Sequence, residues 1–141
     1  MIGIFVMAAA LQLAAPAPVQ PAVDWRVAPV ASGSWTWRAI PGGSEALFLD
    51  GRGVQLAVRC SMGSRLVSLI RTGAINGAPV VVRTSNAERA LPSVATLTAR
   101  DPLLDAIAFS RGRFAVEGGG AVRLIVPAWP EAARSIEDCR K

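Results

Sequence analysis

Residues 34–60 read SWTWRAIPGGSEALFLDGRGVQLAVRC, and this stretch decides the fold class. Trp35 and Trp37 lie on one side of an alternating segment, and Val54, Leu56 and Val58 alternate with less apolar neighbours, as in strands that cover a core with one face. Pro41–Gly43 forms a turn between the first two segments. Asp50-Gly51 separates the next two and favours a tight hairpin, because both residues tolerate a positive φ. The stretch therefore predicts three successive antiparallel strands.

Further short strands are expected along the rest of the chain, separated by turns. The alternation places them at residues 66–71, 80–84, 88–91, 113–116 and 122–126. A helix is predicted with Asp101 as its N-cap, Pro102 as its first residue and Gly112 at its end. The pattern indicates an α+β fold, mostly an antiparallel β sandwich or barrel, with one or two packed helices.

The last helix is predicted to begin near Pro130 and to be C-terminal. Four residues repeat at helical spacing and define its apolar face: Trp129, Ala132, Ala133 and Ile136. Three charged residues are expected on the opposite, solvated face: Glu131, Arg134 and Asp138. The helix should therefore lie on the sheets with Trp129 and Ile136 buried.

Cys60 and Cys139 are the two cysteines. Cys60 has the same parity as Val58 and should face inward, while Cys139 lies at the edge of the apolar face of the last helix. An even number of cysteines in an exported chain favours a disulfide. The alternative is a pair of buried free thiols. A metal site is not expected, because two cysteines without histidine supply too few zinc ligands.

The first residues indicate export. A short apolar run ends in Ala15-Pro16-Ala17, the A-x-A pattern that precedes a signal-peptide cleavage site. The first basic residue is Arg26, so the usual basic start is missing and a membrane anchor is the alternative; however, the run is shorter than the roughly 20 residues that a spanning helix needs. We expect a periplasmic or secreted protein without an integral membrane span after cleavage. Its predicted parts are a signal peptide (1–17), a proline-rich extended leader attached through Trp25 (18–33) and a single globular β-rich domain (34–141).

The chain has a formal net charge of +5, and Lys141 is its only lysine among fifteen basic residues. Scattered arginines usually solvate a surface. Alternatively, guanidinium groups recognise carboxylates or phosphates through paired hydrogen bonds. Five arginines are candidates for such anion binding, three on strands, where alternation is expected to place them outward, and two beside Gly112: Arg59, Arg71, Arg83, Arg111 and Arg113.

Two further alternatives concern these arginines and the tryptophans. Arg111 and Arg113 can instead pair with Asp105 or Glu117. The tryptophans at positions 25, 35 and 37 can form a stacking platform for a ligand, although aromatics spaced by two on a strand more often belong to the core.

Several catalytic chemistries are excluded. Without histidine, Ser-His-Asp and Cys-His mechanisms cannot operate, and a lysine only at the C-terminal position disfavours a Ser-Lys dyad. No glycine-rich segment continues into the Gly-Lys-Ser/Thr of a nucleotide-binding loop, so no cofactor is expected. Two carboxylate pairs are left, Asp101 with Asp105 and Glu137 with Asp138, and capping or solvation explains both. We therefore predict no catalytic residue and no enzyme.

The segment 101–140, DPLLDAIAFSRGRFAVEGGGAVRLIVPAWPEAARSIEDCR, resembles a group of short exported bacterial proteins of unknown function. In that group a capped helix leads into an SRGRF strand, a second strand and a PAWPE…DC helix. The same ending is loosely similar to the invasion-associated locus B family. The resemblance implies export, a β sandwich and a disulfide, and it brings no catalytic residues.

The sequence therefore predicts an exported, non-enzymatic domain that binds a protein or a cell-envelope component. The alternative is an arginine-mediated binder of an anionic polymer: lipopolysaccharide, peptidoglycan or, less expected, nucleic acid. A carboxylate hydrolase is a third and weaker option.

Overall fold

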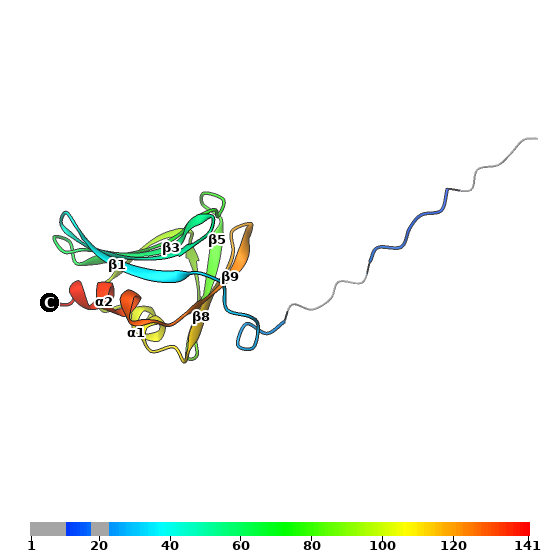
Figure 1. The fold of residues 1–141 in the computed structure, drawn as a ribbon. Helices are drawn as coiled ribbons and strands as arrows, with labels where there is room; N and C mark the ends of the chain where they lie inside the picture. Colours follow the sequence, from blue (N-terminus) through cyan, green and yellow to red (C-terminus); the bar gives the residue numbers. More distant parts are fainter. Residues whose placement is uncertain (1–10, 18–22) are drawn as a thin grey trace, which may run out of the picture.

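The computed structural model describes residues 11–17 and 23–141 (Figure 1). Residues 1–10 and 18–22 lie outside the described residues. The predicted signal peptide falls mostly on them, as does the first part of the predicted leader, so both stay predictions. Residues 11–17 form no helix or strand.

Nine strands and two helices make up the described part of the chain. They run in the order β1 (Ser34–Ile40), β2 (Gly43–Asp50), β3 (Gly53–Ser61), β4 (Leu66–Arg71), β5 (Pro79–Arg83), β6 (Glu88–Pro92), β7 (Val94–Thr98), α1 (Pro102–Ala108), β8 (Arg113–Gly118), β9 (Ala121–Pro127) and α2 (Pro130–Asp138). The first sheet has the order β1-β2-β3-β4-β7 and the second β6-β5-β8-β9, and neighbouring strands in both sheets are antiparallel. The two sheets do not close into a barrel, so the structure confirms the sandwich. Strand β7 was not predicted.

The core lies between the two sheets and is closed at one side by the helices (Figure 1). Trp35 pairs with Phe48 across β1 and β2, and Phe48 pairs with Leu56 of β3, so one row of side chains faces inward. The Trp35 ring stands edge-on to Phe48 at 5.6 Å between centroids. Its indole N–H donates to the Pro127 carbonyl at 2.8 Å, which satisfies a buried polar group.

Helix α1 begins as predicted and ends earlier than predicted. The Asp101 carboxylate accepts the Leu103 N–H at 2.9 Å, and Pro102 is the first helical residue. The expected end at Gly112 is wrong, because the helix stops at Ala108. The buried Ser110 hydroxyl donates to the Arg113 carbonyl at 2.5 Å, which turns the chain toward β8, and Gly112 takes a positive φ of 74° inside that turn.

Helix α2 lies where predicted, but its buried face is rotated from the expected one. Trp129 is 45% exposed and Asp138 is 8% exposed, which reverses the expected sides of both residues. The buried face instead includes Ala132, Ser135 and Ile136. The reason is polar: Asp138 accepts a hydrogen bond from the Ser44 hydroxyl of β2 at 2.7 Å.

The same Asp138 carboxylate accepts from the Trp37 indole at 3.2 Å and from the Lys141 ammonium at 3.1 Å. Burial by itself raises the pKa of Asp138, and the hydrogen bonds from Ser44, Lys141 and Trp37 outweigh that effect and lower the pKa below its ordinary value. Helix α2 is therefore attached to the first sheet by a charged, fully hydrogen-bonded carboxylate.

We expect the protein to lose stability in acid through Asp138 and two similar carboxylates. The pKa values of Glu45 and Asp101 are also lowered in the folded chain, by arginine partners. A carboxylate whose pKa is lower in the folded state than in the unfolded state stabilises the folded protein at pH values above the unfolded pKa, near 4. This contribution disappears as the pH falls through the folded pKa. Urea unfolding should give a constant free energy from pH 7 to about 5 and a falling one below about pH 4.

The variant Asp138→Asn isolates one contribution, since an amide keeps an acceptor and loses the charge. It should be less stable than the parent at pH 7 and should lose less stability between pH 5 and 2.5. An unchanged loss over that range would contradict the role given to Asp138.

Candidate functional site

The five candidate arginines do not share one surface. Arg59 is exposed on the outer face of β3, as predicted, where its Nε donates to Glu45 at 3.0 Å. Arg38 of β1 holds the other oxygen of that carboxylate at 2.6 Å. Burial raises the pKa of Glu45, and these two guanidinium groups lower it overall. Arg59 thus belongs to an ion triad whose carboxylate is buried, and this triad has one net positive charge.

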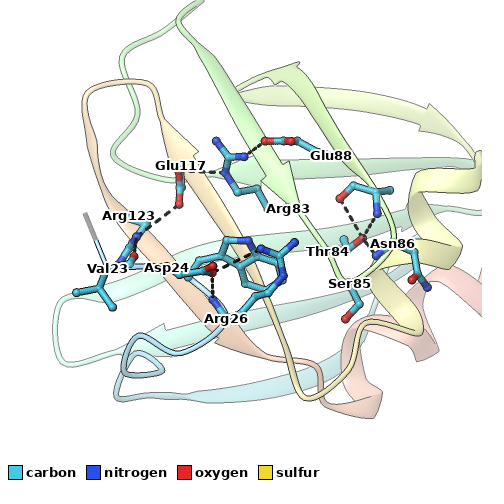
Figure 2. Close-up of a pocket in the computed structure, with 12 residues that line it drawn as sticks. Val23, Asp24, Arg26, Arg83, Thr84, Ser85, Asn86, Glu88, Glu117 and Arg123 are labelled. Atoms are coloured by element: carbon cyan, nitrogen blue, oxygen red, sulfur yellow. Dashed lines mark hydrogen bonds and ion pairs between the residues drawn. The ribbon is translucent and has the colours of Figure 1, made fainter. Parts of the chain in front are cut away.

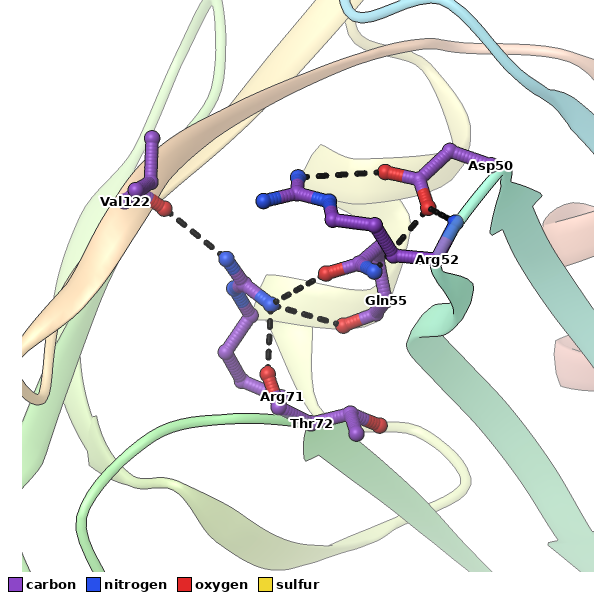
Figure 3. A network of polar contacts seen from close by, with 6 residues as sticks. All are labelled: Asp50, Arg52, Gln55, Arg71, Thr72 and Val122. Atoms are coloured by element: carbon purple, nitrogen blue, oxygen red, sulfur yellow. Dashed lines mark hydrogen bonds and ion pairs between the residues drawn. The ribbon is translucent and has the colours of Figure 1, made fainter.

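The prediction that Arg71 faces outward is wrong. Arg71 is 7% exposed and points between the sheets, with the parity of the buried Leu69 (Figure 3). Its guanidinium donates to the Gln55 carbonyl at 3.1 Å and to the Thr72 carbonyl at 2.5 Å. On the opposite side it donates to the Val122 carbonyl of β9 at 2.8 Å. Desolvation lowers the pKa of Arg71, and its role is to join the two sheets.

Arg83 lies on the outer face of the second sheet, half-buried, and it is neutralised by carboxylates (Figure 2). Its guanidinium forms an ion pair with Glu88 of β6 and donates to Glu117 of β8 at 3.1 Å. Arg123 approaches the other oxygen of Glu117 at 3.8 Å. Arg83 therefore belongs to a network of mixed charge and does not present a free cation.

Arg111 and Arg113 come together in the turn between α1 and β8. Neither pairs with Asp105 or Glu117, because Asp105 is bound by Arg140 at 2.8 Å and Glu117 by Arg83. The Arg113 guanidinium donates to the Ala28 carbonyl, and the Arg111 backbone N–H donates to the Ser85 hydroxyl at 2.8 Å. The alternative pairing with Asp105 or Glu117 is thus not observed. The Arg113 side chain contacts the N-terminal residue Ala28, and both arginines line a pocket together with Trp25.

Residues 23–31, which we call the N-terminal segment, lie against the outer face of the second sheet. Trp25 and Ala28 are buried with Ala115 and Ile125 in a small apolar cluster separate from the main core. Trp25 attaches this segment to the domain, as predicted. The prediction that the leader is extended and unpacked is wrong for residues 23–31, because they pack on the sheet. Three hydrogen bonds hold its backbone. The Arg113 guanidinium donates to the Ala28 carbonyl, and the Arg123 guanidinium donates to the Val23 carbonyl at 2.5 Å. The Ala31 N–H donates to the Ile125 carbonyl at 2.8 Å.

The packed segment creates two adjoining pockets on this face. The first, which we call the arginine pocket, has a volume of about 230 Å³. Its lining residues are Trp25, Arg26, Ser85, Arg111 and Arg113. The second, the outer cleft, has a volume of about 660 Å³ and lies between the N-terminal segment, the β5–β6 turn and the outer side chains of β8 and β9 (Figure 2). The two pockets share Trp25, Arg26 and Ser85.

The arginine pocket is cationic. Three of its five lining residues are arginines, and none is an acid. Arg26 lies over the Trp25 ring at 4.9 Å from its centroid, a cation–π contact, and it also approaches Asp24 at 3.5 Å. Arg113 is fixed by the Ala28 carbonyl. Guanidinium groups in such a pocket can donate N–H bonds to the carboxylate or phosphate oxygens of a ligand.

The three tryptophans singled out by the sequence do not form a common platform. Trp35 is a core residue, as expected for aromatics spaced by two on a strand. Trp37 lies under Arg134 of α2, whose guanidinium is 3.3 Å from the ring centroid. Trp25 lies on the opposite side of the second sheet, in the N-terminal segment.

The two carboxylate pairs have structural contacts. Asp101 caps α1, as predicted, and accepts two hydrogen bonds from Arg89 at 2.6 and 2.9 Å. Those bonds from Arg89 lower the pKa of Asp101, which disfavours a general acid there. The expectation that Asp138 is solvated is wrong, because its carboxylate is buried against Ser44. Within residues 11–17 and 23–141, no group of three or more potential metal-ligating acids and cysteines is found.

The disulfide between Cys60 and Cys139 is confirmed, with 5.5 Å between the two Cα atoms. It joins β3 to the end of α2 and is compatible with an extracellular or periplasmic protein. In the described part of the chain, no helix has the length and apolar character needed to cross a membrane.

Comparison with protein-family models, with curated proteins and with solved structures found no match to this chain. The resemblance to the invasion-associated locus B family therefore stays a prediction. So does the likeness to the short exported proteins.

Sequence reasoning missed Arg26, Ser85 and Arg123. Arg26 and Arg123 are about a hundred positions apart, and Ser85 lies in a turn with no motif around it. Only the neighbouring Trp25 was singled out, as the point of attachment of the leader. The position of this segment on the sheet is decided by contacts distant in sequence, which a local pattern does not contain.

Proposed function

We propose that this chain is an exported, non-enzymatic domain that binds an anionic group of a cell-envelope component in the arginine pocket. The observation that carries the proposal is the convergence of Arg26, Arg111 and Arg113 on one pocket without a lining carboxylate. Of the five candidate arginines, Arg59 and Arg83 are paired with acids and Arg71 is buried. The geometry thus favours anion binding over a protein partner. The site includes two of the five candidate arginines, Arg111 and Arg113, together with Arg26.

The pocket is organised before a ligand arrives. Arg113 is held by Ala28, Arg26 lies on Trp25, and Ser85 is fixed by the Arg111 backbone N–H. Side chains that are already in place lose less conformational entropy on binding. A larger part of the free energy of each charge-assisted hydrogen bond therefore contributes to the affinity. Export is supported by the disulfide and by the A-x-A pattern. A non-enzymatic role is supported by the lack of histidine and by the structural contacts of the acids in the two carboxylate pairs.

We expect Arg111→Ala to weaken the binding of inorganic phosphate about five- to tenfold. The substitution removes one charge-assisted hydrogen bond, and roughly 1–1.5 kcal/mol corresponds to that change in dissociation constant. Arg111 is exposed, so the fold should not change. NMR titration of the folded domain with phosphate at about 0.1 M ionic strength, where distant charges are screened, measures the affinity.

Arg52→Ala is the matched control. Arg52 is exposed in the β2–β3 hairpin, so its loss lowers the net charge equally at a place outside the pocket. Its affinity should stay within about twofold of the parent, because distant surface charges are screened by salt. Equal weakening by both variants would indicate a general charge effect and would contradict the proposed site.

A further inference from the structure

The outer cleft continues the arginine pocket, so a ligand held by its anionic group extends into the cleft. Trp25, Arg26 and Ser85 line both spaces. The cleft volume of about 660 Å³ lies in the range of sites for small molecules. The chemistry of the cleft therefore restricts what the rest of the ligand can be.

The cleft is balanced in charge, unlike the arginine pocket. Three acids and three arginines line it, and they pair among themselves. Figure 2 shows Arg83 between Glu88 and Glu117, with Arg123 on the far side of Glu117. A second negative group placed here meets carboxylates directly and is repelled. The ligand body in the cleft is therefore neutral, and its anionic group lies only at the arginine pocket.

The cleft favours groups that both donate and accept hydrogen bonds. A carboxylate accepts only and a guanidinium donates only, and they alternate along the wall beside the exposed Asn86 carboxamide. A hydroxyl group can satisfy either kind of neighbour, whereas an apolar side chain of a peptide satisfies neither. The apolar lining is small, since Trp25 is 7% exposed and only Val23 and Ala87 accompany it.

We infer that the ligand is an acidic saccharide. Its carboxylate or phosphate substituent lies against Arg26, Arg111 and Arg113, and its neutral, hydroxyl-bearing ring lies in the outer cleft near Asn86. This inference rests on the proposed function, which requires only that the pocket holds an anion.

Calorimetric titration of the full exported domain tests it with five compounds. Lactobionate and lactose 1-phosphate carry one anionic group on a sugar. Lactose lacks the charge, and acetate and inorganic phosphate lack the sugar. We expect each acidic sugar to bind at least tenfold more tightly than lactose and than its matching anion, because both spaces are filled at once. The tighter of the two acidic sugars identifies the substituent as carboxylate or phosphate.

Two variants separate the sugar contact from the anion contact. Asn86→Ala should weaken both acidic sugars about fivefold and leave phosphate binding unchanged, since Asn86 lines only the cleft. Arg111→Ala should weaken the acidic sugars and the free anions alike.

The outcomes distinguish the two proposals. Phosphate that binds as tightly as lactose 1-phosphate, or acidic sugars unaffected by Asn86→Ala, would overturn the saccharide and leave Arg111-dependent anion binding standing. Binding of none of the five compounds through Arg111 would overturn the proposed function as well.

Discussion

A chain without the Cys60–Cys139 bond should unfold with a free energy about 3–4.5 kcal/mol lower than that of the parent. The bond spans 79 positions, so its loss frees a large loop in the unfolded state, and the entropy model gives about 4.5 kcal/mol as an upper value for such a loop. Both cysteines are almost fully buried, at 0% and 1% exposure, where the bond joins β3 to α2. The corresponding decrease in the melting temperature is about 10–20 °C.

The double variant Cys60→Ala, Cys139→Ala tests this, since alanine brings no polar group into the buried site. Urea unfolding of the parent with and without a reducing agent provides the control, because reduction removes the bond without changing the packing volume. The double variant and the reduced parent should agree within about 1 kcal/mol. A change below about 1 kcal/mol in both would show that the bond contributes little to stability.

The second large effect is expected from Arg71→Met, which should lower the free energy of unfolding by about 2–3 kcal/mol. Methionine fills a similar volume but removes the guanidinium bonds to three carbonyls: those of Thr72 and Val122 lose their donor, and that of Gln55 keeps only the Thr72 backbone N–H. Hydrogen bonds from a charged group contribute about 1.5–3 kcal/mol each, and removing the cost of burying the charge offsets only part of their sum. Because Val122 belongs to β9 and Arg71 to β4, the bond that is lost joins the two sheets (Figure 3).

The exposed Arg100 provides the comparison for this variant. Arg100→Ala removes the same charge from the surface and should change the free energy of unfolding by less than about 0.5 kcal/mol. Arg71→Lys should lie between the two, since one ammonium reaches fewer of the acceptors. If Arg71→Met is as stable as the parent, the hydrogen bonds between the sheets contribute no more free energy than the desolvation of the guanidinium costs.

The alternation of residues 34–60 was enough to predict three of the five strands of the first sheet, β1 to β3, and the inward direction of Cys60. Each strand has a period of two, so local sequence decides which side chains share a face. The same rule, applied to β4, places Arg71 on the side of Leu69, inward. The expectation that alternation places Arg71 outward assigned the wrong face of β4 to it, and the carbonyls around the guanidinium stabilise the charge on the inner face.

The rotation of α2 and the assembly of the arginine pocket were beyond such rules. Helical spacing gives Trp129 and Ile136 one face, but the hydrogen bond between Asp138 and Ser44 turns the helix so that the carboxylate is buried. The missed strand β7 has short side chains at many positions and a weak apolar signal; its pairing with β4 supplies the backbone hydrogen bonds that hold it.

The sequence by itself determined the class of fold, the strands of the hairpins, the start of both helices and the disulfide, because period, turn residues and cysteine count act over short distances or by elimination. The tertiary structure alone decided which arginines are free. Arg59 and Arg83 meet acids from neighbouring strands, Arg71 meets carbonyls of the other sheet, and Arg111 and Arg113 meet Arg26 of the N-terminal segment. A charge becomes a binding group only when its partners lie elsewhere, and the position of those partners depends on contacts between residues up to a hundred positions apart.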